Sequence, residues 1–165
     1  MSEQQYQDGA QWLEKLMALS GLAAGVEAKT IVDDINDGCW LVIDQSQLSQ
    51  EQIEAVIGDR GGVLDSIQYL ANTVLNLGLS RDDQQAYTVE LDGYRARRQE
   101  ELKVLADKAA KTVKDTQTEY EIPALSSAER RQVHSLLTSY EDLETFSRGR
   151  EPDRRLVVRL AGQAD

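Results

Sequence analysis

The sequence predicts an α+β protein in which two small α/β-sandwich domains follow each other along 165 residues. In the first half, short runs rich in β-branched and aromatic residues alternate with amphipathic segments of helical length. A glycine-bracketed loop at residues 57–62 separates two of these segments. The second half opens with a long charged helix and ends in a hairpin pattern. A chain of this length can bury one ordinary core or two small ones.

Charge is distributed unevenly over the chain, whose net charge is −11. Residues 1–92 hold 4 basic and 16 acidic side chains, a net of −12, whereas residues 93–165 hold 14 and 13, a net of +1. A nucleic-acid binder usually carries a basic surface. The charge therefore argues against tight binding of a polyanion by the first half and directs attention to the second.

The composition also bears on location and chemistry. A single cysteine, Cys39, excludes an internal disulfide, and with no secretory pattern at the start of the sequence it favours a reducing, cytoplasmic location. No apolar run approaches the roughly 20 residues of a membrane span. Cys39 could act as a nucleophile beside a histidine, but a small buried thiol is favoured. His134 is the only histidine, and neither zinc-ligand spacing nor a nucleotide-binding loop is present, so we expect no enzyme, cofactor or metal.

The first half predicts the order helix, strand, strand, helix, helix, strand. We expect residues 1–8 to be a disordered tail and residues 9–92 to form the first domain. The first helix spans 9–22, and its apolar stripe should lie against a sheet. The strands are expected at 30–32, 39–43 and 87–91, with a turn at 33–38. The helix after the glycine loop should bury the stripe Leu64, Ile67, Ala71, Val74 and Leu77.

The loop Gly58-Asp59-Arg60-Gly61 is the candidate site of the first half. Its glycines allow positive φ and the close approach of another backbone, and the following helix begins with unpaired amides that suit a phosphate. Alternatively, Gly58 only ends one helix and Gly61 gives slack before the next. Arg60 can bind a phosphate, whereas Asp59 repels one by about 1 kcal/mol at 4 Å in bulk water. We therefore expect a weak contribution from this loop.

The second half holds the other candidate site. Ser126 and Glu129 predict a capping box, and Arg130 and His134 lie four residues apart on the same side of the helix that it starts. Nearby basic residues that can bind phosphate are Arg131, Arg154 and Arg155. The long helix ending at Thr116 is expected to point basic side chains outward, either along a phosphate backbone or simply into solvent; these are Arg95, Arg98, Lys103, Lys111 and Lys114.

Several of these segments resemble one bacterial family. The first-half order with a Gly-x-x-Gly turn between its central helices resembles a type II KH domain. Residues 57–70 look like the KH signature of the Jag (KhpB) family, in which a KH domain is followed by an R-3-H domain, named for an Arg and a His with three residues between them. Residues 144–149 and 154–159 are similar to the closing hairpin of that second domain, which we place at 93–162 and expect to have the order helix, strand, helix, strand, strand. The family usually has basic residues at both central loop positions, so Asp59 departs from it.

The resemblance implies a function. It implies a non-catalytic protein that binds single-stranded RNA, or alternatively single-stranded DNA, and acts as a post-transcriptional regulator or RNA chaperone. Phosphate contacts would come mainly from Arg130, Arg131, His134, Arg154 and Arg155, with the KH loop as the weaker part. The competing interpretation is a protein-protein adaptor whose degenerate KH domain pairs with a KH-only partner protein. The sequence leaves the oligomeric state open.

Overall fold

The computed structural model describes residues 3–31 and 38–162, and the chain divides into two compact units. Unit 1 is Met1–Arg95 and unit 2 is Ala96–Asp165. The division therefore falls three residues later than the boundary expected at residue 92, inside the first turn of a helix. Each unit has its own sheet and its own hydrophobic core.

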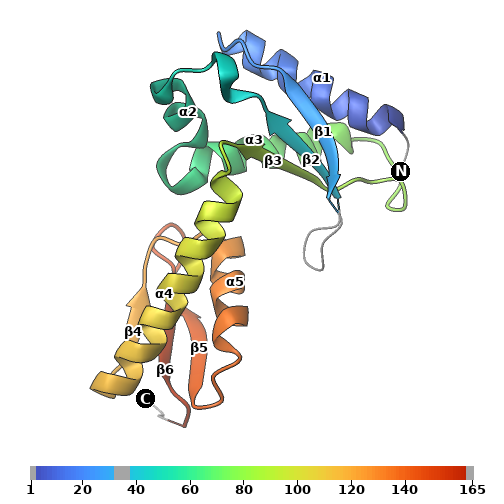
Figure 1. Ribbon diagram of the computed structural model, residues 1–165. Coiled ribbons are helices and arrows are strands. Elements are labelled where there is room, and N and C mark those ends of the chain that lie inside the picture. Colours follow the sequence, from blue (N-terminus) through green and yellow to red (C-terminus); the bar gives the residue numbers. More distant parts are fainter. Residues whose placement is uncertain (1–2, 32–37, 163–165) are drawn as a thin grey trace. The chain divides into compact units, whose positions relative to one another are not determined.

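Unit 1 has the predicted order of helices and strands (Figure 1). A three-stranded sheet in the order β1-β2-β3 pairs β1 antiparallel to β2 and β2 parallel to β3. Short 3-10 turns, η1 (Gln45–Gln47) and η2 (Asp59–Gly61), precede and follow the second helix. The elements are α1 (Glu3–Leu19), β1 (Val26–Ile31), β2 (Gly38–Ile43), α2 (Gln50–Ile57), α3 (Gly62–Leu75) and β3 (Tyr87–Leu91).

The prediction of a disordered tail over residues 1–8 is wrong from Glu3 onward, because α1 already begins there. Within this first part of the helix, the side chain of Gln4 donates a hydrogen bond of 2.8 Å to Asp8, and Tyr6 packs against the core. Gly9 lies inside the helix, where an added Cβ would come within 2.9 Å of the Tyr87 ring. The glycine therefore marks a close helix–sheet approach and not the helix start.

The strands of unit 1 differ from the prediction mainly at one end. β1 begins at Val26, four residues before the predicted start, whereas β2 and β3 match closely. Val32 and the predicted turn residues 33–37 lie outside the described residues. The helices bury one face of the sheet, where Leu13 of α1 meets Leu41 and Val89 with no exposed surface on any of the three.

Cys39 is equally buried, and burial raises the pKa of its thiol to about 11, so a structural thiol is confirmed.

Helix α3 covers the open edge of strand β3 with side-chain amides. Asn72 donates to Tyr87 O at 2.7 Å and accepts from Tyr87 N at 2.9 Å, and Asn76 does the same with Gln85 at 2.7 Å in both directions. Gln68 accepts from Val89 N at 3.0 Å. Four helical residues rise about 6.0 Å and two strand residues about 6.6 Å, so successive amides stay in register with alternate strand residues.

This arrangement explains why the predicted stripe of α3 is only partly buried. Leu64 and Ala71 are fully buried and Ile67 is half-buried, but Val74 is 47% exposed and Leu77 is 81% exposed. The amides must face β3, which turns the helix so that Val74 points to solvent. Leu77 lies beyond the end of the helix at Leu75.

Unit 2 has the predicted order α-β-α-β-β, and the α+β class is confirmed. Its sheet has the order β4-β6-β5, with β6 antiparallel to both neighbours. Val113 and Val133, from its two helices, meet Val158 of β6 in the core on one face of the sheet. The elements are α4 (Tyr94–Thr116), β4 (Tyr120–Ile122), α5 (Ser127–Leu137), β5 (Leu143–Arg148) and β6 (Arg155–Leu160). Over residues 3–31 and 38–162, no helix combines the length and apolarity that crossing a membrane requires.

Candidate nucleic-acid interface

A depression of about 330 Å³ lies in unit 2 between the first turns of α5 and the β5–β6 hairpin. The capping box predicted from the sequence is present, with Ser126 Oγ accepting from Glu129 N at 3.2 Å and Glu129 accepting from Ser126 N at 2.8 Å. It fixes where α5 begins and thus which side chains face the hairpin. The depression is lined by Ser127, Arg130, Arg131, His134, Thr145, Phe146, Ser147, Arg154 and Leu156.

Arg130 forms the floor of this depression and is only 5% exposed. One end of its guanidinium donates to Leu125 O at 2.7 Å and more weakly to Arg154 O at 3.5 Å. The other end donates to Ser127 Oγ at 3.0 Å and pairs with the carboxylate of Glu151. The sequence placed Arg130 on the same side of the helix as His134, but the structure buries Arg130 between the start of α5 and the hairpin.

Three exposed side chains surround that floor. Arg131 and Arg154 face solvent, and neither pairs with a carboxylate within the part of the chain that the structure describes. His134 also faces solvent, and its Nδ1 contacts Thr145 Oγ1 on β5, which fixes the ring against the strand. Positive charge is thus available at the rim, next to a ring nitrogen and hydroxyl groups that can bond to an oxyanion.

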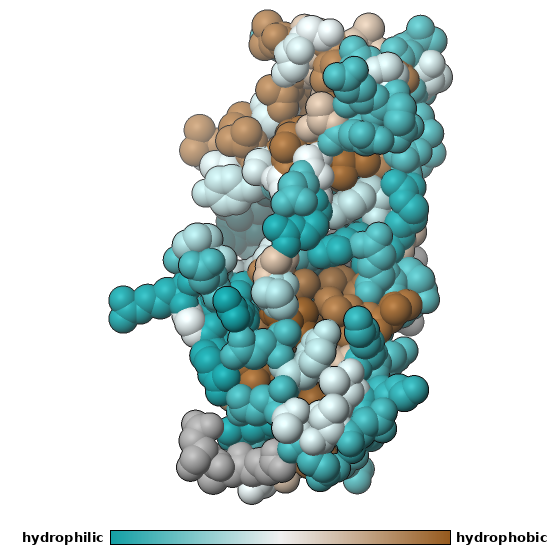
Figure 2. Space-filling model, turned by 90° about the vertical axis from the view of Figure 1, so that its left-hand side faces the viewer, coloured by the Kyte–Doolittle hydropathy of each residue, from teal (hydrophilic) through white to brown (hydrophobic). Residues whose placement is uncertain are grey.

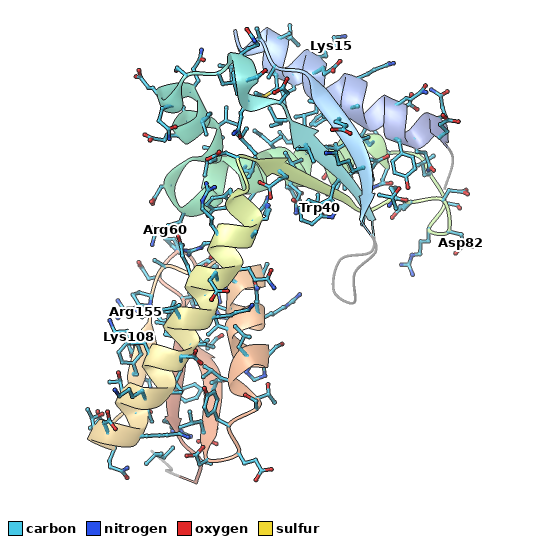
Figure 3. The ribbon with its side chains drawn as sticks, viewed as in Figure 1. Lys15, Trp40, Arg60, Asp82, Lys108 and Arg155 are labelled. Atoms are coloured by element: carbon cyan, nitrogen blue, oxygen red, sulfur yellow. The ribbon has the colours of Figure 1, made fainter. Side chains whose placement is uncertain are left out.

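Arg155 does not belong to this site. Successive residues of a strand point to opposite faces, so Arg155 emerges on the sheet face away from the helices (labelled in Figure 3). There it donates to Glu121 at 2.8 Å, and Arg148 pairs with Glu121 at 2.9 Å and Glu119 at 3.0 Å. Arg159 pairs with Glu144 at 2.5 Å. We call these six residues the Arg–Glu network; its charges compensate one another and cover the open face.

The basic side chains predicted to point outward from the long helix are mostly paired. Arg95 pairs with Asp65 of unit 1 at 2.5 Å, and Arg98 pairs with Glu129 at 2.7 Å and Glu101 at 2.8 Å. Lys103 and Lys114 pair with Glu100 and Asp142, whereas Lys111 is exposed without such a partner among the described residues. The expectation that Arg95 and Arg98 point outward is therefore wrong, because their side chains are mostly covered by protein.

The glycine loop of unit 1 is shaped by the fold itself. Gly58 and Gly61 both have positive φ, 74° and 78°. A Cβ on Gly58 would lie 2.8 Å from Val63 N, and one on Gly61 would lie 2.5 Å from the Tyr94 ring. Arg60, labelled in Figure 3, has φ 49° and pairs with its neighbour Asp59 at 3.0 Å. Local packing thus accounts for both glycines, and the loop carries its own counter-charge.

Sequence reasoning missed three side chains that bond Arg130 or His134. Thr145 holds His134, Ser127 accepts from Arg130, and Glu151 pairs with Arg130 from the segment between β5 and β6. The alternation of β5 carried a usable signal, because Thr145 lies two residues after the core residue Leu143 and so faces the helices. Nothing in the sequence pattern indicated that Glu151 folds back onto α5.

Comparison with known proteins gives the same assignment for this part of the chain. Residues 100–160 match the R-3-H domain family. The RNA-binding protein KhpB of Clostridium symbiosum is 34% identical over 113 residues, which is 68% of this chain and 50% of that protein. KhpB of Bacillus subtilis is 30% identical over 113 residues, 67% of this chain and 53% of the relative. KhpB of Lactiplantibacillus plantarum is 33% identical over 106 residues, 64% of this chain and 32% of that relative.

An α-β-β-α-α-β unit with a Gly-x-x-Gly loop, followed by a unit whose central helix presents Arg130 and His134, defines a two-domain protein with a KH-like half and an R-3-H half. The chain belongs to the Jag (KhpB) family. It spans about half the length of the two relatives from Clostridium symbiosum and Bacillus subtilis.

Proposed function

We propose that this protein binds single-stranded RNA through the phosphate backbone, at the depression of unit 2. The observation that carries the proposal is the rim, where Arg131 and Arg154 face solvent without a carboxylate partner among the described residues. Five other arginines of unit 2 are ion-paired, whereas Arg131 and Arg154 line the depression and face solvent. The RNA-binding relatives support the choice of RNA as ligand.

Each residue then has a distinct role. Arg131 and Arg154 contact phosphate oxygens, and His134 adds a hydrogen bond from a ring that Thr145 orients. Arg130 links the start of α5 to the hairpin, because it bonds Leu125 O and Ser127 Oγ as well as Arg154 O and Glu151. Phe146 is the one phenyl or indole ring among the described residues that line the depression, so base stacking contributes little. The site therefore tolerates many sequences and accepts single-stranded DNA as well.

Fluorescence anisotropy of a labelled, mixed-sequence single-stranded RNA tests this assignment on the full chain. Replacing both Arg131 and Arg154 by Ala is expected to weaken binding at least tenfold, since a charge-assisted hydrogen bond contributes about 1.5–3 kcal/mol. Arg155→Ala removes the same charge from the opposite face and serves as the matched control. Equal affinities of the double variant and Arg155→Ala would refute the assignment.

A post-transcriptional regulator or RNA chaperone is the cellular role that this binding mode suits. Phosphate-led binding with little base selectivity lets one protein act on many transcripts. RNA bound by the protein in cells, recovered by crosslinking, should accordingly span many unrelated transcripts and lose enrichment in the Arg131→Ala, Arg154→Ala double variant. A single enriched motif would argue for a specific reader instead.

A second role is supported by an apolar stripe on unit 1. Val63, Leu70 and Val74 lie on one side of α3 and are 44–47% exposed, and Leu77 continues the stripe at 81%. Asp65, paired with Arg95, is the only charged residue of α3, although unit 1 is strongly acidic. Figure 2 shows hydrophobic side chains reaching the surface of this unit. We infer that the stripe binds a KH-only partner protein, as an adaptor would.

This adaptor role has its own experiment. Leu70→Glu places a charge in the middle of the stripe, and Gln11→Glu, which adds the same charge at an exposed position of α1, is the control. With a purified KH-only protein from the same genome, sedimentation should show a complex for the wild type and for the control but none for Leu70→Glu. A complex that survives Leu70→Glu would exclude α3 as the contact surface, while RNA binding by unit 2 would be unaffected either way.

A further inference from the structure

Among the residues that the structure describes, Glu151 is the one carboxylate that pairs with a residue lining the basic depression of unit 2. None of the residues lining the depression is acidic. Glu151 comes from the segment between β5 and β6 and pairs with Nη2 of the Arg130 guanidinium, the nitrogen that also donates to Ser127 Oγ. Arg130, the most buried cation of the proposed phosphate site, is thus already paired with a carboxylate.

The two partners differ greatly in burial. The side chain of Arg130 is 5% exposed, whereas that of Glu151 is 58% exposed. Arg130 is held by Leu125 O, Ser127 Oγ and Arg154 O, which are neutral acceptors, so Glu151 is its only charged partner in the described structure. A carboxylate with more than half of its surface in water can rotate away, but the guanidinium cannot follow it. The buried charge then needs a replacement anion.

We propose that Glu151 is a built-in competitor for the phosphate backbone: it holds Arg130 in the free protein and is displaced by a phosphate oxygen when RNA binds. This inference rests on the proposed function and extends it, because it makes Arg130 a second, deeper phosphate contact that opens only on binding. The exchange keeps the charge of Arg130 compensated in both states. Glu151 lowers the affinity of the site, so that only a ligand able to supply a phosphate oxygen at this depth gains the Arg130 contact.

The test compares two variants of the full chain that lose one negative charge in the same segment. Glu151→Gln keeps the shape and the neutral acceptor but loses the charge that competes, while Asp153→Asn loses a charge that contacts no cation in the described structure. Anisotropy with labelled single-stranded RNA is measured at two salt concentrations. Glu151→Gln is expected to bind roughly fivefold more tightly than Asp153→Asn, corresponding to about 1 kcal/mol.

The outcomes separate the two levels of the proposal. If the wild type binds RNA and Glu151→Gln binds no more tightly than Asp153→Asn, the competitor role is overturned while the proposed function stands. Weaker binding by Glu151→Gln, with unchanged thermal unfolding, also overturns it, because Glu151 would then support the site. If no protein binds, both fail. Glu151→Ala is a second variant, expected to bind more tightly than the wild type, should Glu151→Gln not fold.

Discussion

Arg130 and Arg131 are neighbours on α5 with opposite surroundings. Arg130 is 5% exposed and makes hydrogen bonds to three parts of the backbone or side chains around it, whereas Arg131 projects into solvent at the rim of the depression. A buried guanidinium costs desolvation that only dense hydrogen bonding offsets. The buried arginine therefore shapes the site, and the exposed arginine supplies the charge that a ligand meets first.

The glycine loop gives a prediction at the same scale, because its two last glycines are under different constraints. Gly61 has φ 78° and faces the Tyr94 ring at a distance that excludes a Cβ, whereas nothing lies within 4 Å of a Cβ on Gly62. Gly61→Ala is expected to lower the free energy of unfolding by about 2–4 kcal/mol. Gly62→Ala, with helical φ −62°, should be neutral or stabilising by up to about 1 kcal/mol. Urea denaturation measures the free energy of unfolding of both variants. If Gly61→Ala and Gly62→Ala lower it equally, the loop does not have this conformation in solution.

At the scale of elements, α3 takes the place of a missing strand beside β3. The side chains of Gln68, Asn72 and Asn76 bond alternate residues of the strand edge, and Arg95 Nε adds a bond to Val89 O at 3.1 Å. An uncovered edge would offer a row of free backbone groups to other chains. The amides cover it without adding a strand and leave the opposite side of α3 apolar and exposed.

Asn72→Ala should expose this edge. The substitution leaves Tyr87 N and Tyr87 O without their bonds of 2.9 and 2.7 Å, and we expect the free energy of unfolding to fall by about 1–3 kcal/mol. Thr73→Ala, next along the helix, removes only a bond to Tyr69 O on the exposed side and should change stability by less than about 0.5 kcal/mol. Chemical denaturation measures both. Equal free energies of unfolding for Asn72→Ala and Thr73→Ala would show that the side-chain amide of Asn72 contributes nothing to stability.

The Arg–Glu network gives a pH prediction for the sheet of unit 2. Hydrogen bonds from Arg155 and Arg148 lower the pKa of Glu121 below its ordinary value. A carboxyl group whose pKa is lowered by folding contributes stability that is present above its unfolded pKa of about 4.3 and is lost as the pH falls through the folded value. The wild type should therefore lose more stability than Glu121→Gln when the pH is lowered below about 4.3. Thermal unfolding between neutral and acidic pH checks this, and parallel pH curves for both proteins would contradict it.

At the scale of the whole molecule, basic residues are outnumbered by acidic ones, and many of them are ion-paired. The chain has 18 Lys and Arg against 29 Asp and Glu, and ion pairs occupy most of the arginines of unit 2. Binding of a polyanion must then rest on a few contacts. The acidic net charge of −11 weakens long-range attraction of RNA and leaves the local rim of the depression to provide affinity.

The salt dependence of RNA binding should reflect this small number of phosphate contacts. If about three phosphates are neutralised, a plot of log affinity against log salt for single strands has a slope near −2. The double variant Arg131→Ala, Arg154→Ala should flatten the slope, because a protein that neutralises fewer phosphates releases fewer counterions. A slope near zero for the wild type would exclude phosphate-led binding, and one as steep as about −6 would require a far larger basic surface than the depression.

The sequence predicted the order and type of all the long elements, because amphipathic periodicity and capping residues are local signals. It also placed Arg130, Arg131, His134 and Arg154 in one region, and the structure brings them around one depression. What it could not predict depends on tertiary contacts. The charge of Arg130 is compensated by Glu151 from the β5–β6 hairpin, and that of Arg155 by Glu121 from another strand. The rotation of α3 follows from the edge of β3.

The central claim is that RNA contacts the depression of unit 2, and amide chemical-shift mapping of the full chain tests it most directly. On addition of mixed-sequence single-stranded RNA, the largest changes should fall on Arg131, His134, Thr145 and Arg154, with little change in β4, whose Glu121 faces the other side of the sheet. The Arg131→Ala, Arg154→Ala double variant should lose these changes. Changes confined to the loop of residues 58–61, or to the Arg–Glu network, would contradict the account.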